Sequence, residues 1–239
     1  MDNNFSTPGF LWPLLIFICT VVILVGLNKT WIKAGWDKWK RLRSLFGTVI
    51  LVLLWTGLLA VLSNNGFFAD FDKLPPRPPL ALLFPLPFVL VFAFSKKGTQ
   101  LLQLVPPQWL ICMQSFRILV ELLIWFAFLA DKLPIQMTLE GRNFDVITGL
   151  LALPAGYLVM KNKRYAPKLI LAFNITGIVL LLNIIVISML SFPTSFRYFL
   201  NEPSSAEVAQ FPFILLPGVL VPIAYSFHIF SIRQVLIKK

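Results

Sequence analysis

Residues 109–129 read WLICMQSFRILVELLIWFAFL, an apolar stretch that is interrupted by Gln114, Arg117 and Glu121. Successive residues of an α-helix lie about 100° apart, so these three polar side chains fall within an arc of about 60°. The stretch also has the length of roughly 20 residues that a helix needs to cross the hydrocarbon core of a bilayer. The sequence therefore predicts a membrane-spanning helix with one polar face, around which the other helices are arranged.

The composition of the whole chain is that of a polytopic membrane protein. Of its 239 residues, 58% are hydrophobic and 13% are charged, and the mean hydropathy is +0.82. Such a chain is too apolar for a soluble domain. We expect an all-α integral membrane protein that forms a single transmembrane domain over residues 1–239.

Seven apolar stretches are candidates for membrane spans. They cover residues 10–27, 44–63, 80–95, 109–129, 144–160, 168–190 and 211–232. The first follows MDNNFSTPG, which is acidic and lacks the small-residue cleavage site of a signal peptide, so we expect it to be retained as a helix.

The distribution of Lys and Arg between these spans predicts their orientation. Fifteen of the 21 Lys and Arg residues fall on one side, five fall on the other, and Arg117 lies inside a span. Positive residues accumulate in cytoplasmic loops. We therefore expect the N-terminus outside and the C-terminus in the cytoplasm.

The first loop on the basic side, residues 28–43, reads NKTWIKAGWDKWKRLR. Its tryptophans share one helical arc, and most of its charged residues lie opposite. This pattern favours a short helix in the headgroup layer that binds anionic lipid at the cytoplasmic face. An aromatic anchor without a specific ligand is the simpler interpretation.

Prolines are distributed unevenly among the spans. They interrupt the third, fifth and seventh spans and are absent from the second and sixth, and FPLPF at 84–88 has a counterpart in FPFILLPG at 211–218. Paired broken helices in two halves of a chain indicate a transport site. The resulting 3+1+3 layout resembles the topology of SWEET and PQ-loop transporters, which implies mobile proline-bearing helices. Pro107-Gln108 precedes the fourth span instead of lying in a repeat helix, so no site residue is assigned from that resemblance.

Arg117 and Glu121 are the charged groups predicted to lie deepest in the membrane. A charge left in lipid costs at least about 2.5 kcal/mol on insertion scales, so both should face protein or a water-filled cavity. Their i,i+4 spacing allows them to pair with each other. We expect either a structural ion pair or a binding site, in which an anionic solute displaces Glu121 from Arg117 and Gln114 adds a neutral hydrogen-bonding group.

Other polar residues predicted near the outer half of the bundle are weaker candidates. Asn183 faces a cavity or forms an interhelical hydrogen bond, and Asn174 points the opposite way. Glu140 and Arg142 form an outer gate or a solvated salt bridge. Asn143 is expected to cap the fifth span and Asp145 to lie in its first turn. His228, the only histidine, is expected at the inner interface.

Several functional classes lack their motifs in this sequence. A single histidine argues against a zinc hydrolase, and no GxSxG, Walker loop or GxGxxG occurs. The Lys and Arg residues lie between apolar segments, which argues against nucleic-acid binding. The sequence contains no convincing catalytic or metal-binding constellation, and we expect no cofactor.

Three functions remain. The buried charges and broken helices favour a carrier for a small polar or anionic solute or an ion, with Gln114, Arg117, Glu121, Asn183, Glu140 and Arg142 as its binding residues. The alternatives are a seven-helix sensor or receptor, and an accessory subunit of a membrane complex. The short loops favour a bacterial inner membrane.

Overall fold

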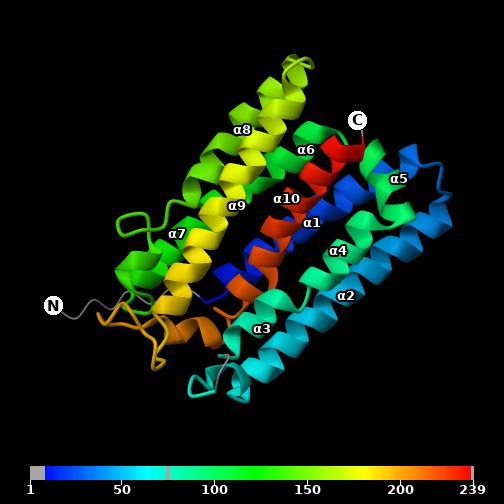
Figure 1. Cartoon of the computed structure of the whole chain (residues 1–239). Helices are drawn as coiled ribbons and strands as arrows, with labels where there is room; N and C mark the ends of the chain where they lie inside the picture. The colour runs from blue at the N-terminus through cyan, green and yellow to red at the C-terminus, as the bar shows by residue number, and fades with distance from the viewer. Residues whose placement is uncertain (1–8, 74–75, 238–239) are drawn as a thin grey trace.

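The computed structural model describes residues 9–73 and 76–237, and it contains only helices and their connections over that part of the chain (Figure 1). The helices are α1 (Leu11–Lys33), α2 (Lys38–Asn64), α3 (Pro78–Leu83), α4 (Leu86–Phe94), α5 (Lys96–Leu104), α6 (Pro107–Cys112), α7 (Phe116–Leu129), α8 (Val146–Lys161), α9 (Ala166–Leu190) and α10 (Val221–Ile237). Short 3-10 turns lie at Phe67–Ala69, Met113–Ser115, Ile135–Met137 and Ser205–Ala209, and a π-helical turn at Leu216–Leu220 leads into α10. The leader MDNNFSTP falls outside the described residues.

Among the described residues, five segments are long and apolar enough to cross a membrane. They are α1, α2, Pro107–Leu129, α9 and Leu216–Ile237, and a sixth is added when the bent segment α3–α5 is counted. The structure is therefore that of an all-α chain with five to six candidate membrane-spanning helices, as in an integral membrane protein.

Two of the seven predicted spans do not form a single helix long enough to cross a membrane. Residues 80–95 form α3 and α4 with a break at Pro85, and the chain then turns by 78° into α5. Ser95 adopts an extended backbone there and accepts the Gly98 N–H with its hydroxyl at 2.9 Å, so it ends α4 and caps α5. The fifth span appears as α8, whose 16 residues extend about 24 Å, less than the roughly 30 Å hydrocarbon core.

The separate interfacial helix expected at residues 28–43 is wrong. Helix α1 continues to Lys33 and α2 begins at Lys38, so only four residues connect them. Asp37 starts α2 by accepting the N–H groups of Trp39 and Lys40, and Trp31 stacks on Trp36 with ring centroids 5.1 Å apart. Most of these residues are helical, as predicted, but they form the end of α1 and the start of α2 instead of a helix of their own.

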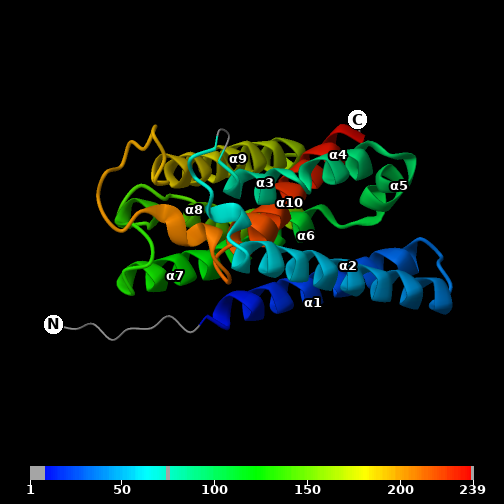
Figure 2. The same cartoon turned by 90° about the horizontal axis from the view of Figure 1, so that it is seen from below.

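Helix α10 lies in the middle of the bundle, where it packs on α9, α6, α4 and α5. Figure 2 shows α1 and α2 along one side of the molecule, and α9, α3 and α4 towards the opposite side. The outward faces of α1 and α2 expose large apolar side chains such as Phe17, Val25, Leu51 and Leu54. Such faces are stable only against lipid or another apolar surface.

Small residues on α8 allow close contact with α6 and α7. A Cβ atom at Gly149 would approach the Ile118 nitrogen to 2.9 Å, and one at Gly156 would approach Cys112 Sγ to 2.3 Å. Ala152 lies between them on the same face and is fully buried. This spacing of small residues is typical of tightly packed membrane helices.

Side chains bond the carbonyls that interior prolines leave without an α-helical donor. Pro222 has no N–H to offer Gly218 O, and Trp55 Nε1 donates to that oxygen at 2.8 Å. Leu102 O, in the last turn of α5, is bonded in a similar way and accepts from Gln234 Nε2. Broken helices are tolerated in a membrane when neighbours supply such bonds.

We predict that Trp55→Phe lowers the free energy of unfolding by about 1 kcal/mol, because the ring is kept but the bond to Gly218 O is lost. Trp39→Phe is the matched control, since Trp39 is 72% exposed, and it should change stability by less than about 0.5 kcal/mol. Unfolding in detergent micelles measures both variants. Equal effects would contradict a specific role for the Trp55 bond.

Candidate functional site

The Arg117 guanidinium on α7 is the centre of a buried polar cluster. Arg117 is 2% exposed and lies about 15 Å along the helix axis from Pro107. Its Nε donates to Asp145 Oδ2 at 2.7 Å, and its Nη2 donates to Asp145 Oδ1. The two side chains thus form a bidentate ion pair that joins α7 to the start of α8, since Asp145 is the residue just before that helix.

The expected pairing of Arg117 with Glu121 is therefore wrong. Both residues do share one buried face of α7, as predicted, but the planar guanidinium reaches across to the carboxylate of a neighbouring helix. Gly149 permits that approach of α8 to α7. One signal in the sequence pointed to Asp145: apart from Glu121, it was the only acidic residue that fell inside a predicted span.

His228 is the second partner of Arg117. It lies near the middle of the candidate span Leu216–Ile237 and is 0% exposed, so its expected position at the inner interface is wrong. Arg117 Nη1 lies 3.0 Å from His228 Nε2. A guanidinium can only donate, so Nε2 must accept and the proton of the neutral ring is on Nδ1. Nδ1 in turn donates to Asn174 Oδ1 at 2.8 Å.

Asn174 continues this chain of hydrogen bonds on α9. Its Nδ2 donates to Ser231 Oγ at 2.8 Å and to Ile170 O at 2.7 Å, which agrees with the tautomer assigned to His228. Gly177, one turn further along α9, leaves room for the imidazole, because a Cβ there would lie 2.4 Å from His228 Cε1. The cluster Asp145–Arg117–His228–Asn174–Ser231 thus links α7, α8, α9 and α10.

Asn183, expected as a site residue, lies outside this cluster. Its Nδ2 donates to the backbone carbonyl of Arg142 at 2.8 Å, so it joins α9 to the loop before α8. The two asparagines of α9 do face different surroundings, as helical phase predicted. Asn174 belongs to the buried cluster, whereas the sequence analysis selected Asn183.

Glu121 is bound by the loop between α7 and α8. One carboxylate oxygen accepts the Leu139 N–H at 2.6 Å, and the other accepts from Asn143 Nδ2 at 2.5 Å. Glu121 is 7% exposed and Asn143 is 1% exposed. Asn143 Oδ1 also accepts the Asp145 N–H at 3.0 Å, so this asparagine binds both Glu121 and the backbone of Asp145. The expectation that Asn143 is the N-cap of this helix is wrong, because α8 begins at Val146 and Asp145 occupies the N-cap position.

Gln114 is fully buried one turn before Arg117. Its Nε2 donates to Ala224 O of α10 at 3.0 Å. Its Oε1 and the hydroxyl oxygen of buried Thr148 have no hydrogen-bond partner among the described residues. Both oxygens can therefore still accept a hydrogen bond from a group beside the cluster.

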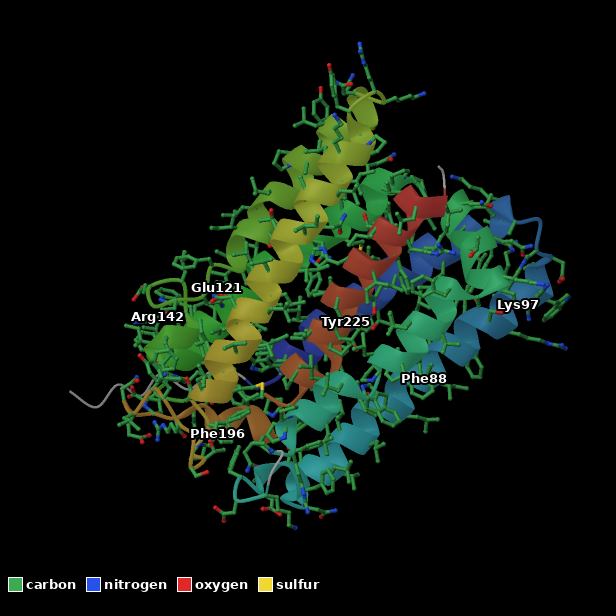
Figure 3. All side chains as sticks on the ribbon, viewed as in Figure 1. Phe88, Lys97, Glu121, Arg142, Phe196 and Tyr225 are labelled. Atoms are coloured by element: carbon green, nitrogen blue, oxygen red, sulfur yellow. The ribbon has the colours of Figure 1, made fainter. Side chains whose placement is uncertain are left out.

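The structure places Glu140 and Arg142 on the surface and not at the cluster. Glu140 accepts from Trp125 Nε1 at 3.1 Å, and the Arg142 guanidinium lies 5.3 Å from the centre of the Phe199 ring. Figure 3 shows Arg142 at the edge of the molecule and Glu121 further in. They do not form the salt bridge that was one of the two expectations.

A cavity of about 80 Å³ lies against the cluster. Most of its wall is apolar and comes from α3, α7, α9 and the turn Leu216–Leu220. The polar part of the wall consists of Arg117, Glu121, Asn143, Asp145 and Ser188. Over the described residues no three His, Cys, Asp or Glu side chains gather into a metal site.

The charges around this cavity do not cancel. Arg117 contributes one positive charge, which Asp145 neutralises. Glu121 accepts only from neutral donors, the Leu139 N–H and the Asn143 amide. When both carboxyl groups are ionised, the cavity therefore carries one excess negative charge, which is costly in a buried site unless a cation or a proton is bound.

Residues 79–236 match the family model described as Domain of unknown function (DUF8737). The chain belongs to this family. The matched region of the DUF8737 family contains every residue of the cluster and the cavity wall except Pro78, whereas α1 and α2 precede it. Comparison with the curated proteins and with the solved structures gives no match.

We predict that Gly141→Ala loosens the loop that holds Glu121. A Cβ at Gly141 would lie 2.3 Å from Ile135 O and 2.5 Å from Gln136 Cα, and such overpacking typically costs about 1–3 kcal/mol. Hydrogen exchange should show faster exchange at Leu139, whose N–H binds Glu121.

Gly57→Ala is the control, since an added Cβ there has no neighbour within 4 Å among the described residues. It should leave exchange at Leu139 unchanged and should not lower stability, because alanine favours the interior of α2 by up to about 1 kcal/mol over glycine. Unchanged exchange in Gly141→Ala would contradict the role of this close contact.

Proposed function

We propose that this protein is an integral membrane carrier for a proton or a small cation, with Glu121 as the binding carboxylate. The observation that carries this proposal is the position of Glu121: it is buried, lines a cavity, and has neutral hydrogen-bond donors instead of a cationic partner. Ionisable groups inside a membrane are costly and commonly mark an ion or proton pathway.

The anionic solute expected from the sequence is less well supported than a cation. That expectation paired Arg117 with Glu121 on the same helix, so that an anion could displace Glu121 and bind Arg117. Arg117 instead donates to Asp145, to His228 and, at 3.5 Å, to Gly177 O, which leaves few free donors for an anion. A cavity of about 80 Å³ also suits a proton or a small ion with few waters better than a large solute.

The broken helices beside the cavity support a carrier in preference to a static bundle. Pro78, Pro79 and Leu82 of the bent segment line one part of the wall, and Leu216, Pro217 and Leu220 of the π-helical turn line another. Interrupted helices of this kind border the binding sites of many transporters. The proposal includes seven spans, with α3–α4 and α8 as the shortened ones, in the 3+1+3 order.

The same proposal places the N-terminus outside and the C-terminus in the cytoplasm of a bacterial inner membrane. The excess of Lys and Arg in alternate loops supports this orientation. In that orientation the loop that binds Glu121 faces the outside. A cation or proton would then reach Glu121 from the outer half of the bundle.

The experiment is a flux assay on the full chain in proteoliposomes. Proton flux is driven by a proton gradient and read with an enclosed pH-sensitive dye, and Na⁺ flux is driven by a Na⁺ gradient and read with an enclosed Na⁺-sensitive dye. We predict that Glu121→Gln lowers flux roughly tenfold or more, because the amide keeps the shape of the side chain but cannot ionise. Glu202→Gln is the matched control, since the Glu202 side chain is 72% exposed, and it should retain full flux.

Full flux in Glu121→Gln would contradict Glu121 as the binding group. A second candidate function, an accessory subunit of a membrane complex, is favoured by the exposed apolar faces of α1 and α2. That function predicts no flux of protons or Na⁺ through the isolated wild-type protein, whereas the carrier predicts flux without a partner.

A further inference from the structure

A second and larger cavity lies away from the Arg117 cluster. It has a volume of about 550 Å³ and is enclosed by α1, α2, α4, α5, α6 and α10. Its wall is almost entirely apolar, with Leu27, Val52, Val89, Leu102 and Phe230 among the lining residues. The volume lies within the range of roughly 300–1,000 Å³ that is usual for ligand sites.

Water is a poor occupant of this cavity. Three of its hydroxyl groups, on Thr30, Thr48 and Ser226, donate to carbonyls of their own helices. A buried water needs two to four polar partners, and this wall offers few. A peptide is equally unsuitable, because its backbone N–H and C=O groups would be buried without partners.

The mouth of the cavity lies between α2 and α4. The rim residues Leu51, Phe84 and Phe88 line the cavity and are 68%, 57% and 64% exposed. Figure 3 shows Phe88 on the outer side of α4. In a bilayer this mouth faces lipid, so an acyl chain can enter the cavity sideways.

Basic residues and unused hydrogen-bond donors lie beside one end of the cavity, here called the basic end, although none of them is part of the cavity wall. Its lining reaches the end of α1 at Thr30, close to Arg41, whose Nη1 donates to Asn28 Oδ1 at 3.1 Å. Nε atoms of Arg41 and Arg233 and the indole N–H of Trp31, which is 6% exposed, are buried with no partner in the described part of the chain. Lys97, at the start of α5, lies at this same end (Figure 3).

We propose that this cavity binds one acyl chain of an anionic phospholipid, whose phosphate is held at the basic end by Arg41 and its neighbours. The apolar wall takes the chain, and the unpaired donors take the phosphate oxygens. This site is separate from the Glu121 cavity, so it does not depend on the carrier function.

The first test is native mass spectrometry of the full chain titrated with phosphatidylglycerol or with phosphatidylcholine. We expect one phosphatidylglycerol to be retained and phosphatidylcholine to bind roughly tenfold more weakly. Val89→Trp, which fills the cavity, should weaken phosphatidylglycerol binding roughly tenfold or more because the chain loses its buried surface. Val91→Trp is the control on the same helix, since Val91 is 72% exposed.

Equal phosphatidylglycerol binding by Val89→Trp and Val91→Trp would overturn the proposal. A matched pair at the basic end tests the phosphate contact: Arg41→Gln should lose the preference for phosphatidylglycerol, whereas Arg43→Gln, at an exposed position, should keep it. Loss of the preference in both variants or in neither would overturn the assignment to Arg41.

A second test uses the wild-type protein and therefore does not depend on whether a variant folds. Phosphatidylglycerol with a photoreactive diazirine near the end of one acyl chain is added to nanodiscs that contain the protein. We expect cross-links to peptides that include Val89 and Ile223, which line the cavity. Cross-links confined to the outward positions of α1 and α2 would overturn the proposal.

Discussion

The ion pair between Arg117 and Asp145 is the interaction on which the rest of this structure depends. An unpaired charge at the centre of a span costs at least about 2.5 kcal/mol on insertion scales, and removing one partner of a buried pair typically costs about 3–5 kcal/mol. Asp145 must therefore lie at the depth of Arg117. Because Asp145 is the residue just before α8, that helix begins inside the bundle and has only 16 residues. The preceding loop is buried with it, as Met137, Thr138 and Asn143 show.

The buried loop gives Glu121 its surroundings. Once Asp145 has taken the charge of Arg117, Glu121 is left with the Leu139 N–H and the Asn143 amide as donors. The same residue, Asn143, binds Glu121 and the backbone of Asp145, so the two carboxyl groups cannot move independently. A change in the charge of Glu121 would act directly on this loop, in which Met137 and Asn143 line the cavity. In the proposed carrier, the hydrogen bonds of this one asparagine would connect the charge of Glu121 to the position of the loop.

Sequence periodicity predicted the helical class and the buried face of Gln114, Arg117 and Glu121, because both follow from local spacing. It failed where a partner comes from another helix. The choice of Asp145 over Glu121, and the burial of His228 and Asn174, depend on Gly149 and Gly177, which set the distances between helices. The broken third span was visible as Pro85 and Pro87, but the 78° turn after Phe94 was not predicted. It depends on Ser95, whose local N-cap bond to Gly98 is not visible in the hydropathy pattern.

The central claim is that Arg117 is paired across helices and not within its own helix, and a pair of double-mutant cycles tests it most directly. The cycles use Arg117→Gln with Asp145→Asn, and Arg117→Gln with Glu121→Gln, measured as free energies of unfolding in mixed micelles. The structure predicts a coupling of about 3 kcal/mol or more between Arg117 and Asp145, and a coupling below about 1 kcal/mol between Arg117 and Glu121. The reverse order of the two coupling energies would contradict the account.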